Sequence, residues 1–102
     1  MIKNLYEETM EELERNGKTP EDILFIATAT QMCNFETFAA AAKAYDYDAG
    51  FGLPEVNMDL VIVGEDWWLG REEYDGSEWW QFYKKPALTN QKFTTSLDLS
   101  WE

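Results

Sequence analysis

The chain has 102 residues, the usual size of one domain, and no apolar run approaches the roughly 20 residues that a membrane span needs. It carries 20 Asp and Glu residues against 8 Lys and Arg residues and no His, a formal charge of −12. This charge disfavours direct binding to nucleic-acid phosphates or to an anionic membrane surface, and it favours a basic partner protein. The absence of His and the single Cys33 exclude His-dependent nucleophilic catalysis, His-ligated zinc and thiolate zinc clusters.

An acidic amphipathic helix is predicted at the N-terminus, over residues 1–17. Apolar side chains recur at helical spacing over residues 2–16, and Gly17 is suited to end the helix. Carboxylates occupy most of the other positions: Glu7, Glu8, Glu11, Glu12 and Glu14. This acidic side is either a solvated surface or a surface presented to a basic partner, and the pattern leaves both interpretations open.

Short strands and a second helix are predicted in the next part of the chain. A cap and one turn over residues 19–22 precede an apolar strand over 23–29, and a brief further strand is expected at Met32–Cys33. Asn34 is a good N-cap for a helix over residues 35–45, which contains four consecutive alanines.

Residues 46–54 are predicted to form a loop, and residues 56–63 a strand. The loop contains Asp46 and Asp48, but its other residues break the spacing of an EF-hand, so we expect no metal there. The strand ends in an uninterrupted apolar run, which is typical of a central strand that is covered on both faces.

A tryptophan-rich β-hairpin is predicted over residues 67–84. Asp75-Gly76 between two strand-like runs is the strongest short-range hairpin signal, and a two-residue loop pairs Tyr74 with Ser77. One face of this hairpin then carries Trp67, Leu69, Arg71, Trp80, Phe82 and Lys84. The opposite face carries Trp68, Gly70, Glu72, Trp79, Gln81 and Tyr83. The first face is expected to cover the second helix.

The opposite face has the ingredients of a ligand slot. Trp68 lies opposite Tyr83, and Gly70 leaves a gap between aromatic side chains. The predicted ligand-binding residues are Trp68, Trp79, Tyr83 and Gln81, with Arg71 and Lys84 placed to meet phosphates. In the other interpretation these rings are core, and Arg71 stacks on Trp80 as a cation–π pair.

The C-terminal tail, residues 87–102, is predicted to contain one more strand. Its apolar residues alternate with polar ones: Phe93, Thr95, Leu97, Leu99 and Trp101 share one side. This strand would pair at the edge of the chain's own sheet or on a second copy in a homo-oligomer. The whole chain is therefore predicted to be one α+β domain, with two helices packed on a mainly antiparallel sheet of four to five strands.

The hairpin block resembles a family of small bacteriophage and prophage proteins. These proteins carry a hydrophobic strand followed by a WWL-x-R-x-EYDGSEWW-x-F block and a proline. The block here runs from Trp67 to Phe82, and the AGFG at residues 49–52 is also similar; the resemblance covers roughly residues 20–86. It implies a phage or prophage origin and a location in the cytoplasm of the bacterial host, and it implies no catalytic activity. Small phage proteins of this size are associated with countering host defence.

Two binding functions follow as expectations, and neither is enzymatic or needs a cofactor. In the first, the aromatic slot sequesters a nucleotide immune signal, because indoles stack on bases. In the second, an acidic surface imitates nucleic acid, as anti-CRISPR inhibitors do, and occupies the basic groove of a defence protein. That surface would comprise Glu8, Glu11, Glu12, Glu72, Glu73, Asp75 and Glu78. A phage assembly or accessory role is a further alternative.

Overall fold

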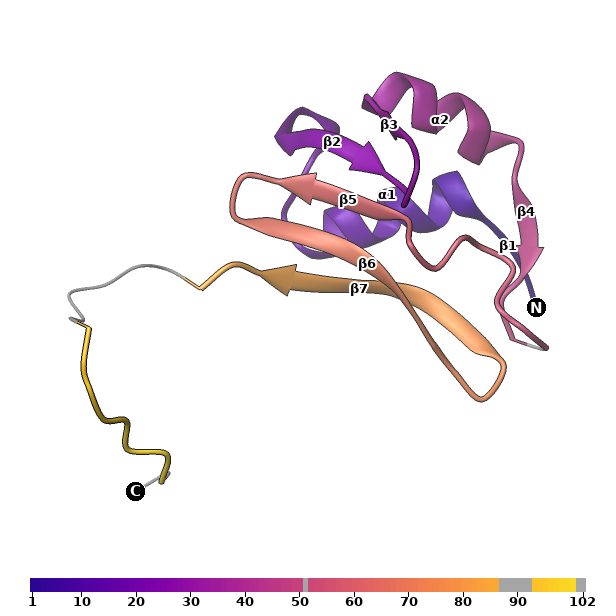
Figure 1. Cartoon of the computed structure of the whole chain (residues 1–102). Helices are drawn as coiled ribbons and strands as arrows, with labels where there is room; N and C mark the ends of the chain where they lie inside the picture. Colours follow the sequence, from indigo (N-terminus) through magenta and orange to yellow (C-terminus); the bar gives the residue numbers. More distant parts are fainter. Residues whose placement is uncertain (51, 87–92, 101–102) are drawn as a thin grey trace.

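The computed structural model describes residues 1–50, 52–86 and 93–100, and it has the predicted α+β architecture (Figure 1). A five-stranded antiparallel sheet has the strand order β3-β2-β5-β6-β7, and β1 and β4 form a separate two-stranded sheet. The elements in chain order are β1 (Ile2–Asn4), α1 (Leu5–Arg15), a 3-10 helix (Pro20–Asp22), β2 (Ile23–Ala27), β3 (Met32–Cys33), α2 (Phe35–Lys43), β4 (Asp46–Asp48), β5 (Val61–Gly64), β6 (Trp67–Tyr74) and β7 (Ser77–Lys84).

The N-terminal helix is shorter than predicted. Residues 2–4 form β1 and pair antiparallel with β4, in the segment predicted to be a loop. Asn4 then caps α1, because its side chain accepts a hydrogen bond from the Glu7 backbone N–H at 3.1 Å. Helical periodicity within residues 2–16 contains no information on a partner strand more than 40 residues away. The prediction of a helix start at residue 2 was therefore wrong.

The second helix begins where the sequence predicts. The Asn34 side chain accepts from the Thr37 N–H at 2.9 Å, and the helix ends at Lys43, shortly before β4. The brief strand Met32–Cys33 is also confirmed and pairs with β2.

The central strand β5 is confirmed but starts later than predicted. Residues 57–60 form a turn in which Asn57 accepts hydrogen bonds from the N–H groups of Asp59 and Leu60. From Val61 onward the strand lies between β2 and β6, and its Ile62 is fully buried.

The hairpin register is confirmed in full. Tyr74 pairs with Ser77, and Asp75 and Gly76 both have positive φ, at 51° and 89°, as a tight two-residue turn requires. The face that carries Trp67, Leu69 and Trp80 points inward. The exposed fractions of these three residues are 2%, 0% and 3%. We call this side of the five-stranded sheet the inner face.

Helix α1, rather than α2, covers the hairpin on this inner face. Trp80 donates its indole N–H to the Thr9 hydroxyl on α1 at 2.9 Å. Helix α2 packs on the part of the sheet formed by β2, where Phe38 and Ala42 belong to the same core cluster as Ile26. The expectation that the hairpin covers the second helix was therefore wrong. The covalent order of the helices does not determine which part of the sheet each one covers.

A buried ion cluster joins α1 to the hairpin. The Arg71 guanidinium lies 3.2 Å from a Glu8 carboxylate oxygen and 3.1 Å from one of Glu78, and all three residues are buried. It also donates to the Tyr47 hydroxyl on β4 at 2.9 Å, while this hydroxyl donates to Glu8. The guanidinium carbon lies 4.9 Å from the centroid of the Trp80 ring, so the predicted cation–π contact is present.

The environment of this cluster favours the charged guanidinium and the neutral phenol. Burial alone would lower the pKa of Arg71, but the nearby carboxylates and the Tyr47 hydroxyl raise it above its ordinary value. Burial, followed by the hydrogen bond to Glu8, raises the pKa of Tyr47 far above its ordinary range. The Tyr47 hydroxyl therefore stays protonated and remains a donor at physiological pH.

Glu78 also holds the loop that precedes β5. Its carboxylate accepts hydrogen bonds from the backbone N–H groups of Glu55 at 2.6 Å and Val56 at 3.1 Å. Its own backbone N–H donates to the carbonyl of Ala49 at 3.1 Å. Glu78 thus connects β7 to both sides of position 51: its backbone N–H binds the segment before it, and its carboxylate binds the segment after it.

The described part of the tail is not a strand of this chain's sheet. Residues 93–100 have no strand partner within the described residues, and all of them are exposed. The tail runs away from the domain in Figure 1. Of the two pairings that the sequence leaves open, the one with the chain's own sheet is therefore not formed by residues 93–100. Residues 87–92 and 101–102, including Trp101, lie outside the described residues.

Arg71→Met is expected to lower the free energy of unfolding by about 3–5 kcal/mol, because it leaves two buried carboxylates without their cation. Urea denaturation of the wild type and the variant measures this difference. Arg15→Met is the control, since Arg15 itself is exposed where it pairs with Glu12, and its loss should change stability by less than about 1 kcal/mol. Equal stability of the wild type and Arg71→Met would contradict a structural role for the cluster.

Candidate functional site

The five-stranded sheet has a second side, which we call the outer face. Strand register assigns to it the residues that alternate with the buried ones: Val61 pairs with Gly70 and Val63 with Trp68. The outer face comprises Phe25, Ala27, Met32, Val61, Val63, Trp68, Gly70, Glu72, Trp79, Gln81 and Tyr83.

Neither helix covers the outer face. Both helices pack against the inner face, and β5, β6 and β7 are seen in front of α1 in Figure 1. None of the outer-face residues is fully buried, and Met32 and Gln81 are exposed. The tryptophans of the hairpin are thus divided: Trp67 and Trp80 are core, whereas Trp68 and Trp79 remain accessible.

Trp68 and Tyr83 lie opposite each other, as predicted, but they do not form the walls of an open slot. Their rings stack with centroids 5.2 Å apart and an interplanar angle of 16°. A Cβ at Gly70 would lie 3.5 Å from the Tyr83 ring, so this ring leans over the glycine. The gap expected at Gly70 is therefore partly filled by Tyr83, and the two rings already occupy each other's faces.

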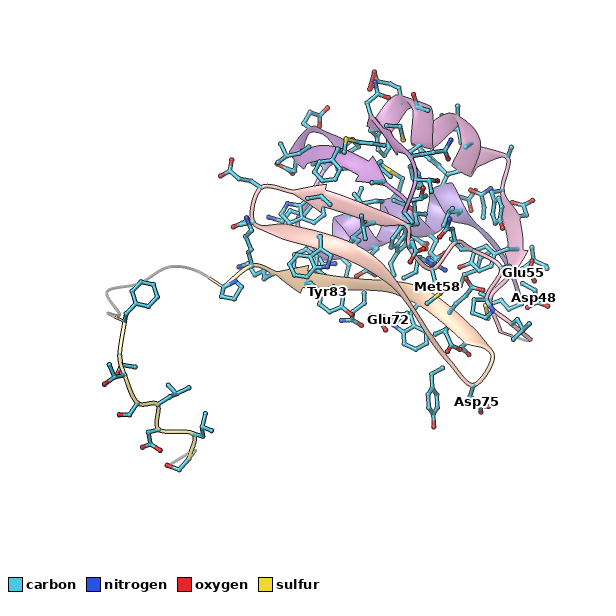
Figure 2. All side chains as sticks on the ribbon, viewed as in Figure 1. Asp48, Glu55, Met58, Glu72, Asp75 and Tyr83 are labelled. Atoms are coloured by element: carbon cyan, nitrogen blue, oxygen red, sulfur yellow. The ribbon has the colours of Figure 1, made fainter. Side chains whose placement is uncertain are left out.

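Polar atoms on the outer face bind mainly to one another. The Tyr83 hydroxyl donates to the Glu72 carboxylate, and this hydrogen bond raises the pKa of Tyr83. Figure 2 shows Glu72 and Tyr83 on the adjacent strands β6 and β7, with Asp75 at the tip of the hairpin. The Trp79 indole N–H donates weakly to the Gln81 side-chain oxygen at 3.4 Å. The result is a flat aromatic surface with few free polar groups.

The predicted ligand-binding residues separate into two groups. Trp68, Trp79, Gln81 and Tyr83 lie together on the outer face. Arg71 does not: its side chain has no exposed surface and pairs with Glu8 and Glu78 on the inner face. Lys84 is exposed, but its register partner is the inward Trp67. The phosphate contact expected of Arg71 is therefore incompatible with the fold.

The predicted acidic surface is also divided. Glu8 and Glu78 are buried against Arg71, with 8% and 4% of their surface exposed, and they cannot contact a partner. Glu72 lies on the outer face, whereas the register places the neighbouring Glu73 on the inner side. Glu11 and Asp75 are exposed, and Glu12 is half-buried and pairs with Arg15. The seven predicted acidic residues on α1 and at the hairpin tip therefore do not form one continuous surface.

A groove beside α2 was not predicted from the sequence. A cavity of about 600 Å³ lies between this helix and the loop before β5, with Phe38, Ala41, Tyr45 and Leu60 among its lining residues. The Tyr45 hydroxyl closes one side by donating to the Glu55 carbonyl at 2.5 Å. The groove is formed by segments that are far apart in the sequence, so no pattern within one segment indicates it.

The described residues contain neither a membrane-crossing helix nor a metal site of three or more ligands. Both helices are too short and too polar to span a bilayer, and no three Asp, Glu or Cys side chains gather as ligands in this part of the chain.

Comparison of the chain with family models, curated proteins and solved structures finds no match. The bacteriophage resemblance of the hairpin block thus stays a prediction. The geometry of the outer face is the basis for the functional proposal.

Trp80→Ala is expected to cost about 3–5 kcal/mol of stability, because it empties a buried site on the inner face. Trp79→Ala removes the same side chain from the adjacent outer-face position and should cost less than half as much. Denaturant unfolding of the two variants measures the difference. Equal losses would show that the outer face is covered as well.

Proposed function

We propose that the protein is a non-enzymatic binding protein whose outer face docks on a basic partner protein. The observation that carries this proposal is a continuous aromatic and aliphatic sheet face that neither helix covers. Tryptophan and tyrosine are the residues that most often dominate the binding energy of protein interfaces. An apolar centre of this kind with a charged border is the usual anatomy of such an interface.

Acidic side chains lie at both ends of this face, which supports a basic partner, and the exposed Lys84 and Lys85 lie beside them at the Asp66 end. Glu65 and Asp66 are exposed in the turn between β5 and β6, and Asp75 is exposed at the hairpin tip. The formal charge of −12 adds a long-range attraction for a cationic protein. Complementary charge of this kind speeds association and excludes acidic partners.

The phage resemblance of the hairpin block directs the search for this partner. A basic groove is typical of proteins that bind nucleic acid, and bacterial defence nucleases are of this class. We infer that the protein inhibits such a host protein by covering its basic surface. The inhibitor would act in the host cytoplasm.

Sequestration of a nucleotide signal is the second candidate. The adjacent Trp79 and Gln81 support it, because an indole stacks on a base at about 1–3 kcal/mol and an amide binds base edges. The outer face as defined carries no Lys or Arg to meet the phosphates, and Trp68 is already stacked on Tyr83. These features favour the protein partner over the nucleotide.

Site-specific photo-crosslinking tests the proposal. A photoreactive amino acid at Gln81, on the outer face, is compared with one at Ala40, which is exposed on α2. In bacterial cells we expect a basic protein to crosslink from position 81 and not from position 40. Because the interface combines aromatic contacts with opposite charge, Trp79→Ala and raised salt should each weaken the capture in a lysate.

Two outcomes would contradict the protein-partner proposal. Equal crosslinking from positions 81 and 40 would show that the outer face is not the interface. In native mass spectrometry, an added mass of nucleotide size that Trp68→Ala/Trp79→Ala abolishes would favour sequestration instead.

A further inference from the structure

Strand β7 is an edge of the five-stranded sheet, and most of this edge has no partner strand among the described residues. In an antiparallel strand the N–H and C=O of one residue point to the same side, and the side alternates along the strand. The Glu78 N–H donates away from β6, to the Ala49 carbonyl, which identifies the outward positions of β7. The next outward positions are Trp80, Phe82 and Lys84. Among the described residues, β6 is the only strand paired with β7.

An open edge of this length is a template for another strand. Its unpaired N–H and C=O groups can form a further ladder, which natural proteins block with bulges or inward charges, or else use for assembly. At the other end of β7 the segment around Ala49 covers the edge. In the uncovered part, from Trp80 to Lys84, the pairing with β6 has no bulge, and the one inward charge, Lys84, lies at its end. The Phe82 carbonyl accepts a single long hydrogen bond, from the Gln81 side-chain amide at 3.5 Å.

The C-terminal tail has the pattern that this edge requires. Phe93, Leu97 and Leu99 are 106%, 74% and 86% exposed, and they alternate with polar side chains. Asp98 is the only charged residue from 93 to 100, in a chain whose formal charge is −12. This segment can therefore approach a second copy with little electrostatic repulsion.

We propose that residues 93–100 of one copy add as a sixth strand to the Trp80–Lys84 edge of a second copy. Within one chain the tail leaves the domain and the edge stays open, so both halves of the contact are present but unpaired (Figure 1). Reciprocal exchange of the two tails satisfies both edges and closes a two-fold dimer. The contact uses backbone groups at the edge and does not depend on the outer-face partner.

Sedimentation velocity of the full chain over a range of concentrations tests this dimer. We expect a transition from the 11.9 kDa chain to a species of twice that mass. Leu97→Asp should weaken the dimer by about tenfold or more, because it places a charge in the apolar row that the dimer would bury. Ser96→Asp is the matched control, since it adds the same charge to the polar row and should have a much smaller effect.

A second pair of variants tests the edge itself. Lys84→Pro removes an outward N–H without removing a hydrogen bond to β6, so it should weaken the dimer, whereas Lys84→Ala should not. Circular dichroism checks that each variant keeps its fold. A full chain that stays monomeric, or equal effects of Leu97→Asp and Ser96→Asp, would overturn the proposal. Hydrogen exchange that shows protected tail amides in a monomer would place the strand on its own β7 and would also overturn it.

Discussion

The buried Arg71 guanidinium, shared by Glu8 and Glu78, is the interaction on which the arrangement of this protein depends. It joins α1, β4 and both strands of the hairpin at one point, and the Tyr47 hydroxyl completes the contact. Removing one member from such a cluster leaves an uncompensated buried charge, so α1, β4 and the two hairpin strands are held in one geometry. In that geometry the side chains of Trp67 and Trp80 point into the core. Because side chains alternate along a strand, it also leaves Trp68 and Trp79 on the opposite side of the sheet.

The outer face and the open edge are therefore consequences of how the inner face is built. A chain of 102 residues with two short helices can cover one side of a five-stranded sheet, and here both helices are used on the inner face. The remaining aromatic surface is wide, nearly free of charge and bordered by carboxylates. These properties suit a basic protein surface better than an anionic small molecule. Among the described residues, β7 therefore has a strand partner on one side only, β6, and its other edge is unpaired from Trp80 onward.

The sequence was most informative where structure is determined locally. The Asp75-Gly76 turn sets the hairpin register, and Asn34 begins the second helix, so both were predicted correctly. The pairing of residues 2–4 with β4 and the choice of α1 to cover the hairpin depend on contacts between distant segments, which periodicity does not encode. Arg71 is an intermediate case. The register placed it beside the inward Leu69 and Trp80, which is a signal of burial, but its partners Glu8 and Glu78 could be recognised only in three dimensions.

The central claim is that Trp68 and Trp79 form an accessible surface while Trp67 and Trp80 are core. The most direct test is NMR of the assigned indole N–H signals with a soluble paramagnetic agent added. The account predicts that the Trp68 and Trp79 signals broaden strongly, and that those of Trp67 and Trp80, whose N–H binds Thr9, persist. Equal protection of all four indoles would contradict it, because the outer face would then be covered and unable to bind a partner.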